Sequence, residues 1–427
     1  MSAETPSLCS APSDDQLLTS LRFLALSLIK GLGPVGVQAL LAFAAQEDVD
    51  PSEEAFWTLA IRALSGQKRL PPAERHLFEQ RIANPFSDAL VWPERDDVLE
   101  WLQGNPTRQL LALGQSNYPY LLSEISDPPL LLYLQGDAEL LQKPQLAIVG
   151  ARRPTAIGLS DARAFAGALT ELGWTITSGL AEGIDAAAHQ GALQANGKTL
   201  AVLGTGIDRC YPANHKSLQQ AIADAGLLVS EYPLGTPPRG PNFPRRNRIV
   251  SGLSVGLLVV EAALKSGSLI SARLASEQGR EVFAIPGSIH QAQSKGCHQL
   301  IKQGAKLTET VMDMHEELSH WLQNAVSMPV YPADSEQIRS AAVDPQTSLF
   351  SKQAASASRC QQPADRSPEE FTSPEAYQIW QAVKAGAGNL DELVLHCQME
   401  TSQISQHCLM LEMQGFLNQN AGRWQTA

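Results

Sequence analysis

The sequence has no long hydrophobic run, few cysteines and no excess of basic residues. None of its apolar stretches approaches the ~20 residues that a membrane-spanning helix needs, and its Ser-rich start lacks the basic and apolar regions of a signal peptide. The six cysteines form no CxxC pair and no array with zinc spacing, which is typical of thiols in a reducing compartment. We therefore expect a cytoplasmic protein with no membrane contact, no metal site and no other cofactor.

The formal net charge of -12 is unlike the basic footprint of most nucleic-acid-binding proteins. Any DNA site therefore requires a local basic group on an acidic chain. Residues 236–252 form such a group, since they contain no acid but include Arg239, Phe243, Arg245, Arg246, Asn247 and Arg248. Arginine binds phosphate with two parallel hydrogen bonds, and an aromatic ring can stack on an unpaired base. An arginine cluster that pairs with acids at an interface is the alternative.

Short apolar runs alternate with helical stretches from residue 145 to about 310. The runs lie at 146–150, 175–178, 199–204, 227–230, 255–260 and 282–285. Continuous apolar strands separated by helices predict a mostly parallel sheet that is covered on both faces. The fold class is therefore α/β, an extended Rossmann-like, doubly wound sheet. A helix over 119–125 and a strand over 130–134 are expected to lead into it.

Helical patterns flank this core. Apolar residues from Leu17 to Leu28 recur at helical spacing, and the turn at 31–36 resembles a helix-hairpin-helix (or SAM-like) element, in which amide groups can hold a phosphate. A plain turn between two helices is the alternative. Three helical stretches at 375–384, 389–397 and 402–413, followed by a hairpin, predict a C-terminal winged helix. The last stretch has no Lys or Arg, so DNA contact, protein contact and simple packing all stay open.

These patterns predict five segments along the chain. The segment between the core and the winged helix is rich in Ser, Ala, Gln and Pro, a composition typical of a flexible linker. We expect a disordered tail (1–14), an N-terminal helical domain (15–110), a Rossmann-like DNA-binding domain (111–322), a flexible linker (323–373) and a winged-helix domain (374–427).

Glycine-rich loops follow most of the expected strands, at the edge where doubly wound sheets bind their ligands. Glycines there let backbone N–H groups approach an anion. The Walker and GxGxxG patterns are both absent, so a mononucleotide or dinucleotide enzyme lacks its usual signature. Asp185 and His189 share a helix face and could form an acid–base pair, although a structural hydrogen bond is the more ordinary interpretation. Glu261, at a strand end, could act in catalysis or bind a backbone group or an arginine.

The order and spacing of the motifs across residues 115–310 resemble the DNA-processing DprA/Smf family. The resemblance lies in Tyr118-Pro119, Asp127-Pro128-Pro129, Val149-Gly150-Ala151-Arg152, the run Ser178 to Asp185, His189, Tyr211-Pro212, Ser230-Glu231-Tyr232, Phe243 to Arg248, Ser266-Gly267-Ser268-Leu269 and Pro286-Gly287. Members usually have Thr where this chain has Ser271, which keeps the hydroxyl group.

The resemblance implies a non-enzymatic protein that binds and protects single-stranded DNA without sequence specificity and loads RecA recombinase on it in natural transformation and recombination. It also implies a homodimer through the Rossmann-like domain, with single-stranded-DNA-binding protein as a further candidate partner. From the resemblance and the strand-end pattern together, the candidate nucleic-acid-binding residues are Gly150, Arg152, Ser178, Gly179, Lys198, Gly204, Phe243, Arg245, Arg246, Asn247, Arg248, Lys265, Ser266, Gly267 and Ser268.

Two other hypotheses stay open. A nucleotide phosphoribohydrolase also has glycine-rich strand ends, but Pro286-Gly287-Ser288-Ile289 departs from the Pro-Gly-Gly-x-Gly-Thr pattern of that group. A regulator that binds double-stranded DNA through the winged helix is the second.

Overall fold

The structure, a computed structural model, describes most of the chain between residues 14 and 323 and part of the C-terminal region. The described residues are 14–28, 37, 40–41, 54–65, 72–87, 89–323, 374–384, 393, 397, 399, 404, 417–420 and 423–426. The chain divides into two compact units, residues 1–351 and 352–427. The finer boundaries expected from the sequence stay predictions, and the tail and nearly all of the linker lie outside the described residues.

Within the described part of the first unit, nine strands form one sheet in the order β1-β2-β6-β5-β4-β3-β7-β8-β9. Neighbours from β6 through to β9 are parallel, whereas β1 and β2 run antiparallel. The strands are β1 (Arg108–Ala112), β2 (Leu131–Gly136), β3 (Gln145–Val149), β4 (Thr175–Ser178), β5 (Thr199–Val202), β6 (Leu227–Ser230), β7 (Gly256–Val259), β8 (Glu281–Ala284) and β9 (Lys306–Leu307). The predicted mostly parallel α/β sheet is confirmed.

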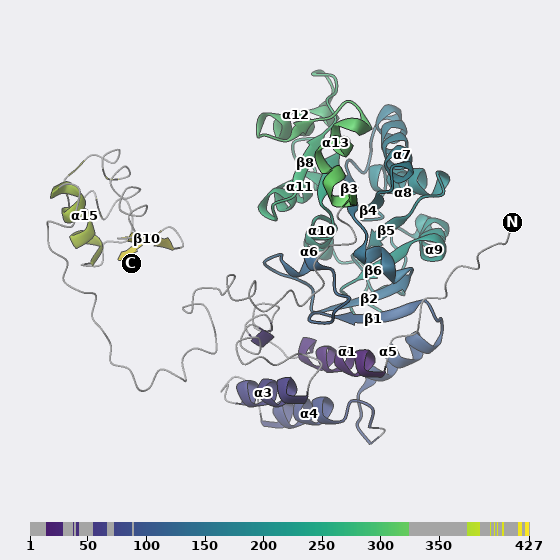
Figure 1. The fold of residues 1–427 in the computed structure, drawn as a ribbon, viewed down its shortest axis with the longest axis vertical. Helices are drawn as coiled ribbons and strands as arrows, with labels where there is room; N and C mark the ends of the chain where they lie inside the picture. The colour runs from purple at the N-terminus through teal and green to yellow at the C-terminus, as the bar shows by residue number, and fades with distance from the viewer. Residues whose placement is uncertain are drawn as a thin grey trace. The chain divides into compact units, whose positions relative to one another are not determined.

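Helices cover both faces of this sheet. Figure 1 shows α7, α8 and α9 to the right of the strands and α10, α11 and α12 to the left. Their bounds, with those of α13, are α7 (Ala156–Glu171), α8 (Ile184–Gln194), α9 (Lys216–Ala225), α10 (Asn242–Gly252), α11 (Ser268–Glu277), α12 (Lys295–Lys302) and α13 (Val311–Gln323). Shorter elements are α6 (Tyr120–Ser123), η1 (Ala138–Gln142), η2 (Ala213–His215) and η3 (Ala292–Ser294).

The central strand β3 is buried on both faces because successive side chains of a strand point to opposite sides. Leu146 and Ile148 join the hydrophobic cluster that contains residues of α7, α8 and α13. Ala147 and Val149 join the cluster that contains residues of α10 and α11. A strand with an apolar residue at nearly every position can satisfy both layers, which is why the continuous apolar runs identified six strands to within two residues at each end.

Three features of this unit differ from the sequence-based expectations. The strands β1 and β9 were missed, since β1 begins with two polar residues and β9 is only two exposed residues long. The arginine segment 243–248, for which no helix was predicted, lies within the helix α10. Pro244 lies in its first turn, where the missing N–H of proline costs no intrahelical hydrogen bond.

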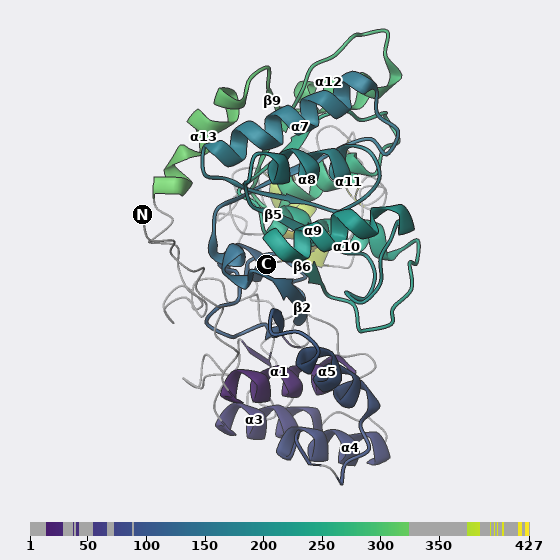
Figure 2. The same ribbon diagram turned by 90° about the vertical axis from the view of Figure 1, so that its right-hand side faces the viewer.

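The N-terminal helices α1 (Asp14–Ser27), α3 (Glu54–Ser65), α4 (Pro72–Ala83) and α5 (Pro93–Gln103) gather beside the β1 edge of the sheet, which Figure 1 labels, and Figure 2 shows the same group of helices from the side. Phe23 of α1 packs edge-on against Trp57 of α3, with ring centroids 5.4 Å apart. Ser20 Oγ donates to Leu110 O at 3.0 Å, and Gln115 Oε1 accepts from Ala112 N at 2.8 Å. These bonds satisfy outward-facing groups of β1. The expected hairpin turn at 31–36 lies outside the described residues.

In the second unit, α15 (Pro374–Lys384) lies against the antiparallel hairpin of β10 (Leu417–Asn420) and β11 (Arg423–Thr426). Ile379, Trp380 and Val383 of α15 are buried. The first helix and the hairpin of the predicted winged helix are thus confirmed, while most of the two helices expected between them lies outside the described residues. No helix described in either unit combines the length and the apolar composition that a bilayer span requires.

The close approach of two chain segments at Gly136 gives a first prediction. A Cβ at Gly136 would lie 2.3 Å from Gly226 O, whereas one at Gly235 would meet nothing within 4 Å, although both glycines have positive φ. We expect Gly235→Ala to lower the free energy of unfolding by about 1–2 kcal/mol, the cost of a left-handed residue. Gly136→Ala should cost about 1–3 kcal/mol more, because the added atom overpacks the site. Urea unfolding of both variants measures this; equal losses would contradict the steric argument.

Candidate nucleic-acid interface

The candidate site lies where the strand order of the sheet reverses. From β3 the chain proceeds through β4 and β5 to β6 on one side, and from β7 through β8 to β9 on the other. In such sheets the loops that leave the carboxyl ends of the two central strands diverge and open a crevice for ligands. A cavity of ≈ 480 Å³ occupies this position, lined by the loops after β3, β4 and β7 and by the first turns of α10 and α11.

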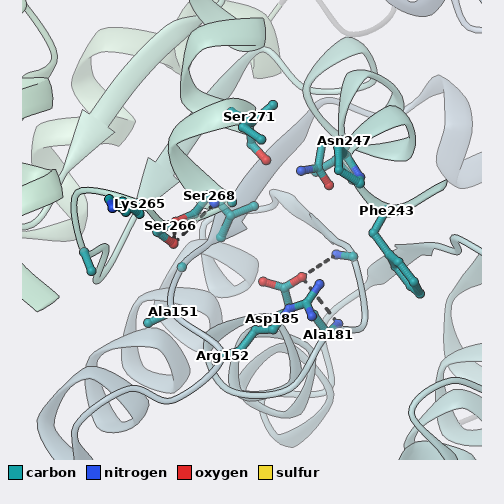
Figure 3. Close-up of a pocket in the computed structure, with 18 of the residues that line it drawn as sticks. Ala151, Arg152, Ala181, Asp185, Phe243, Asn247, Lys265, Ser266, Ser268 and Ser271 are labelled. Carbon is teal, nitrogen blue, oxygen red and sulfur yellow. Dashed lines mark hydrogen bonds between the residues drawn. The ribbon is translucent and has the colours of Figure 1, made fainter. Parts of the chain in front are cut away.

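The lining residues bring together groups from distant parts of the sequence. Figure 3 shows Lys265 and Ser266 on the left of the cavity and Phe243 on the right, with Asn247 and Ser271 above Asp185 and Arg152. Thus the cavity gathers Arg152 with the predicted residues Gly150, Gly179, Phe243, Arg246, Asn247, Lys265, Ser266, Gly267 and Ser268.

Three exposed cations surround the cavity: Arg152, Arg153 and Lys265. Asp185 is the single acid among the described residues that line it, and it is 7% exposed. Its Oδ2 accepts from Gly179 N at 3.2 Å and from Ala181 N at 3.4 Å. Burial raises the pKa of Asp185, while Arg246 and these amides act in the opposite direction. With its only acid bonded to the backbone, the cavity is a local positive region on an acidic chain.

Phe243 forms one wall of the cavity and is half-buried. Its ring lies against Gly204, where a Cβ would stand 2.8 Å from the ring. Arg152 Cζ lies 5.8 Å from the ring centroid, and the Tyr211 ring packs against it with centroids 5.2 Å apart. Gly204 therefore serves the site by giving room to Phe243.

The loop before α11 supplies hydroxyl and amide groups. Ser266 Oγ and Ser268 Oγ lie 2.6 Å apart, and Gly267 stands at the N-cap of the helix with open space where a side chain would be. The N-terminus of α11 carries partial positive charge, which adds to the charge of the neighbouring Lys265. Together these groups can hold an anion at the left-hand wall of Figure 3.

Arg246 is 3% exposed and lies under the cavity rather than on its rim. Its Nη1 donates to Gly179 O at 2.5 Å and also to Val202 O. Burial lowers the pKa of this guanidinium, and Asp185 opposes that shift. Its bonds tie the carboxyl ends of β4 and β5 to α10, so Arg246 shapes the cavity whether or not it also contacts a ligand.

Arg248 and Arg245 do not line the cavity. Arg248, 7% exposed, pairs with Glu231 at 2.5 Å and with Asp127 at 2.9 Å. Exposed Arg245 lies 4.0 Å from Asp127. Arg248 thus follows the alternative given in the sequence analysis, in which arginines pair with acids. Its acidic partners belong to the same chain and not to an interface.

Two further predicted residues lie outside the cavity. Ser178 is fully buried, and its Oγ donates to Ile148 O at 2.6 Å. Lys198 was expected close to the rim, and this placement is wrong: it precedes β5, at the amino edge of the parallel strands, where it pairs with Asp137 at 3.6 Å. A residue before a strand lies at the opposite edge from one that follows it. A DNA contact by Lys198 remains an untested prediction.

The acid–base candidates have structural partners. His189 Nδ1 lies 2.7 Å from Thr199 Oγ1, and burial lowers its pKa to about 3, assisted by Arg246. Asp185 bonds the loop amides described above. Glu261 accepts from Thr155 N at 2.9 Å and from Thr155 Oγ1 at 2.6 Å, which agrees with the expectation that it binds a backbone group.

The sequence analysis missed three polar residues of the cavity, Arg153, Ser271 and Gln293, and no pattern in the sequence marked Gln293. Arg153 follows Arg152 directly in the loop after β3, so the neighbouring cation was itself a signal. Ser271, noted above only for its hydroxyl, lies one turn after Ser268 on α11, the spacing at which two residues share a helix face.

The fold and the cavity define a class of protein: a Rossmann-like α/β protein with a cationic ligand cavity at its switch point. Comparisons with known proteins make this specific. The family described as DNA recombination-mediator protein A matches residues 109–319, and the family described as DprA winged helix domain matches 362–423. The chain is 36% identical to Protein Smf of Synechocystis over 414 residues, 94% of this chain and 96% of that protein. It belongs to the DprA/Smf family of DNA-processing proteins.

Two other relatives agree with this assignment. The chain is 47% identical to Protein Smf of Escherichia coli over 247 residues, which is 57% of this chain and 66% of that protein. The X-ray structure of DNA processing protein A from Streptococcus pneumoniae is 36% identical, with a TM-score of 0.57, and the match covers 72% of this chain and 99% of that one.

A stability comparison separates the buried arginine from the exposed one. Arg246→Met removes the donor to the carbonyls of Gly179 and Val202, so we expect a loss of about 2–5 kcal/mol in the free energy of unfolding, from about 1–3 kcal/mol for each buried carbonyl left without its donor. Arg152→Ala removes an exposed side chain and should change it by less than about 0.5 kcal/mol. Urea unfolding monitored by circular dichroism measures both. Similar losses in the two variants would contradict the structural role of Arg246.

The lowered pKa of His189 predicts acid sensitivity. The unfolded chain binds a proton at this residue near pH 6.5 whereas the folded chain holds it neutral down to about pH 3, so its contribution to stability is complete above 6.5 and is lost as the pH falls. Between pH 6.5 and 5 the loss is about 2 kcal/mol. His189→Gln should be less stable at pH 7 but should lose less between these values. An unchanged pH profile in the variant would rule out His189 as the source.

Proposed function

We propose that the cavity at the switch point binds single-stranded DNA without sequence specificity. The observation that carries the proposal is the combination in one cavity of exposed Arg152, Arg153 and Lys265 with the half-buried ring of Phe243. Cations neutralise phosphates, and a ring accepts any unpaired base, so this pair of features is typical of single-strand binding.

Each part of the cavity has its own task in this mechanism. The arginines after β3 bind phosphate oxygens, and Lys265 with the Ser266–Ser268 loop binds a phosphate at the left-hand wall of Figure 3. Asn247 lines the upper part of the cavity in that view and offers a donor and an acceptor. Phe243 stacks on a base or packs on a sugar. The face of a paired base is hidden within a duplex, so the duplex can use only the phosphate contacts.

The remaining functional proposals concern partners. We propose that the protein protects single-stranded DNA and loads RecA recombinase on it during natural transformation and recombination, and that it acts as a homodimer through the Rossmann-like domain, in the cytoplasm. Membership of a family described as recombination mediators supports the first of these. The proposal includes no catalysis. The strand-end carboxylate Glu261, which a hydrolase could use, is bonded through both of its oxygens to Thr155.

A titration of the full chain tests the binding proposal. We expect labelled oligo-dT to bind more tightly than a duplex of equal length, with a log–log salt slope near −0.7 for each phosphate contacted. Arg152→Ala should weaken binding at least about tenfold, since a charged hydrogen bond contributes about 1.5–3 kcal/mol, and should reduce the slope by about one contact. Fluorescence anisotropy across a salt series measures both.

Lys306→Ala is the matched control, because it removes an exposed cation of the edge strand β9 that pairs with Glu317 and does not line the cavity. It should leave affinity nearly unchanged. Equal binding of oligo-dT and duplex, or an equal effect of Lys306→Ala and Arg152→Ala, would place the binding site elsewhere.

A further inference from the structure

Tyr211 is an exposed aromatic residue next to the cavity that the proposed mechanism does not yet use. It lies in the loop between β5 and η2, and 44% of it is exposed to solvent. Its ring packs against Phe243 with centroids 5.2 Å apart and a tilt of 41°. One face of an exposed ring thus rests on the wall of the cavity, while the rest of the ring faces water.

Arg152, Phe243 and Tyr211 form a continuous row of planar groups. The guanidinium of Arg152 lies 5.8 Å from the Phe243 ring, and that ring contacts Tyr211. Each member comes from a different element: the loop after β3, the first turn of α10, and the loop after β5. The row therefore links two residues that line the cavity to the loop that precedes η2 and α9 in the chain.

The chain on either side of Tyr211 carries cations. Arg209, with 58% of its side chain exposed, precedes it, and exposed Lys216 begins α9. The acid next to Arg209 in the sequence is Asp208, whose Oδ1 accepts from Gly235 N at 2.8 Å and whose Oδ2 lies 3.4 Å from Arg209 Nε. The loop therefore offers phosphates a further pair of basic side chains beside an apolar ring.

We propose that Tyr211 is a second base-stacking position and that the DNA strand leaves the cavity over Phe243 and Tyr211 toward Arg209 and Lys216. The inference rests on the proposed binding of single-stranded DNA and gives that binding a direction and a minimum length. Short oligonucleotides fill the cavity alone, whereas longer ones also cover Tyr211. In the competing role, Tyr211 only shields the ring of Phe243 from water.

Substitutions at Tyr211 in the full chain distinguish these roles. Tyr211→Leu keeps an apolar side chain against Phe243 but removes the stacking face, and Tyr211→Trp keeps and enlarges that face. We expect Tyr211→Leu to weaken binding of a twenty-nucleotide oligo-dT at least about fivefold, the lower bound for one base–aromatic stack. Tyr211→Trp should bind at least as well as the wild type. Neither variant should alter binding of dT3 or of a duplex.

The control variant is Phe86→Ala, which removes an aromatic residue of similar exposure, 47%, in the N-terminal helical region. It should leave all affinities unchanged. Failure of the wild-type chain to bind any oligonucleotide would overturn the proposed function itself. Normal binding of the long oligonucleotide by Tyr211→Leu, or equal losses for dT3 and the long strand, would overturn only the role of Tyr211.

A second measurement follows base stacking directly, in the wild-type chain and in Tyr211→Leu. Single 2-aminopurine substitutions, moved along an oligonucleotide that is just long enough to fill the site, report stacking by loss of fluorescence. We expect two neighbouring quenched positions, one at Phe243 and one at Tyr211, and in Tyr211→Leu only one. A single quenched position in the wild type would show that the strand leaves the cavity by another route.

Discussion

The guanidinium of Arg246 is the interaction on which the candidate site depends. It binds the carbonyls of Gly179 and Val202, the first at the end of β4 and the second at the end of β5, from a position inside α10. Placing a charge under a ligand cavity is costly unless other groups stabilise it, and Asp185 supplies a nearby opposite charge. The same Asp185 accepts hydrogen bonds from the amides of the loop after β4. Arg246 and Asp185 together therefore fix two strand ends, a helix and a loop.

This arrangement reconciles an acidic chain with an anionic ligand. The acids nearest the arginine segment are occupied: Asp127 and Glu231 pair with Arg248, and Glu261 bonds Thr155. Exposed cations then face the cavity without an exposed acid among the described residues that line it. The electrostatic field of a site is set by such local charges within about 10 Å at ordinary salt, so the total charge of the chain says little about this site.

Much of the fold followed from the sequence, because strands buried on both faces leave continuous apolar runs such as 146–150 and 255–260. The residues at strand ends followed too, since parallel strands bring their carboxyl ends to one edge. The individual roles did not. Arg245, Arg246 and Arg248 have the same chemistry and adjacent positions, yet burial separates them into exposed, doubly bonded and ion-paired side chains. The position of each arginine around the axis of α10 decides which of them faces inward. The sequence does not reveal this position, because a segment that contains proline is not recognised as a helix.

The hydrogen bonds that cover the outer edge of β1 have a consequence for self-association of the chain. A strand at the end of a sheet presents unpaired N–H and C=O groups that another chain can recruit. In β1 the carbonyl of Leu110 accepts from Ser20, the amide of Ala112 donates to Gln115, and Gln115 in turn donates to Gln16 O. The N-terminal helix thus covers the edge of β1 with which a strand of another chain could pair. A chain without this helix would expose an apolar edge strand, so we expect the helix to protect the folded chain from aggregation.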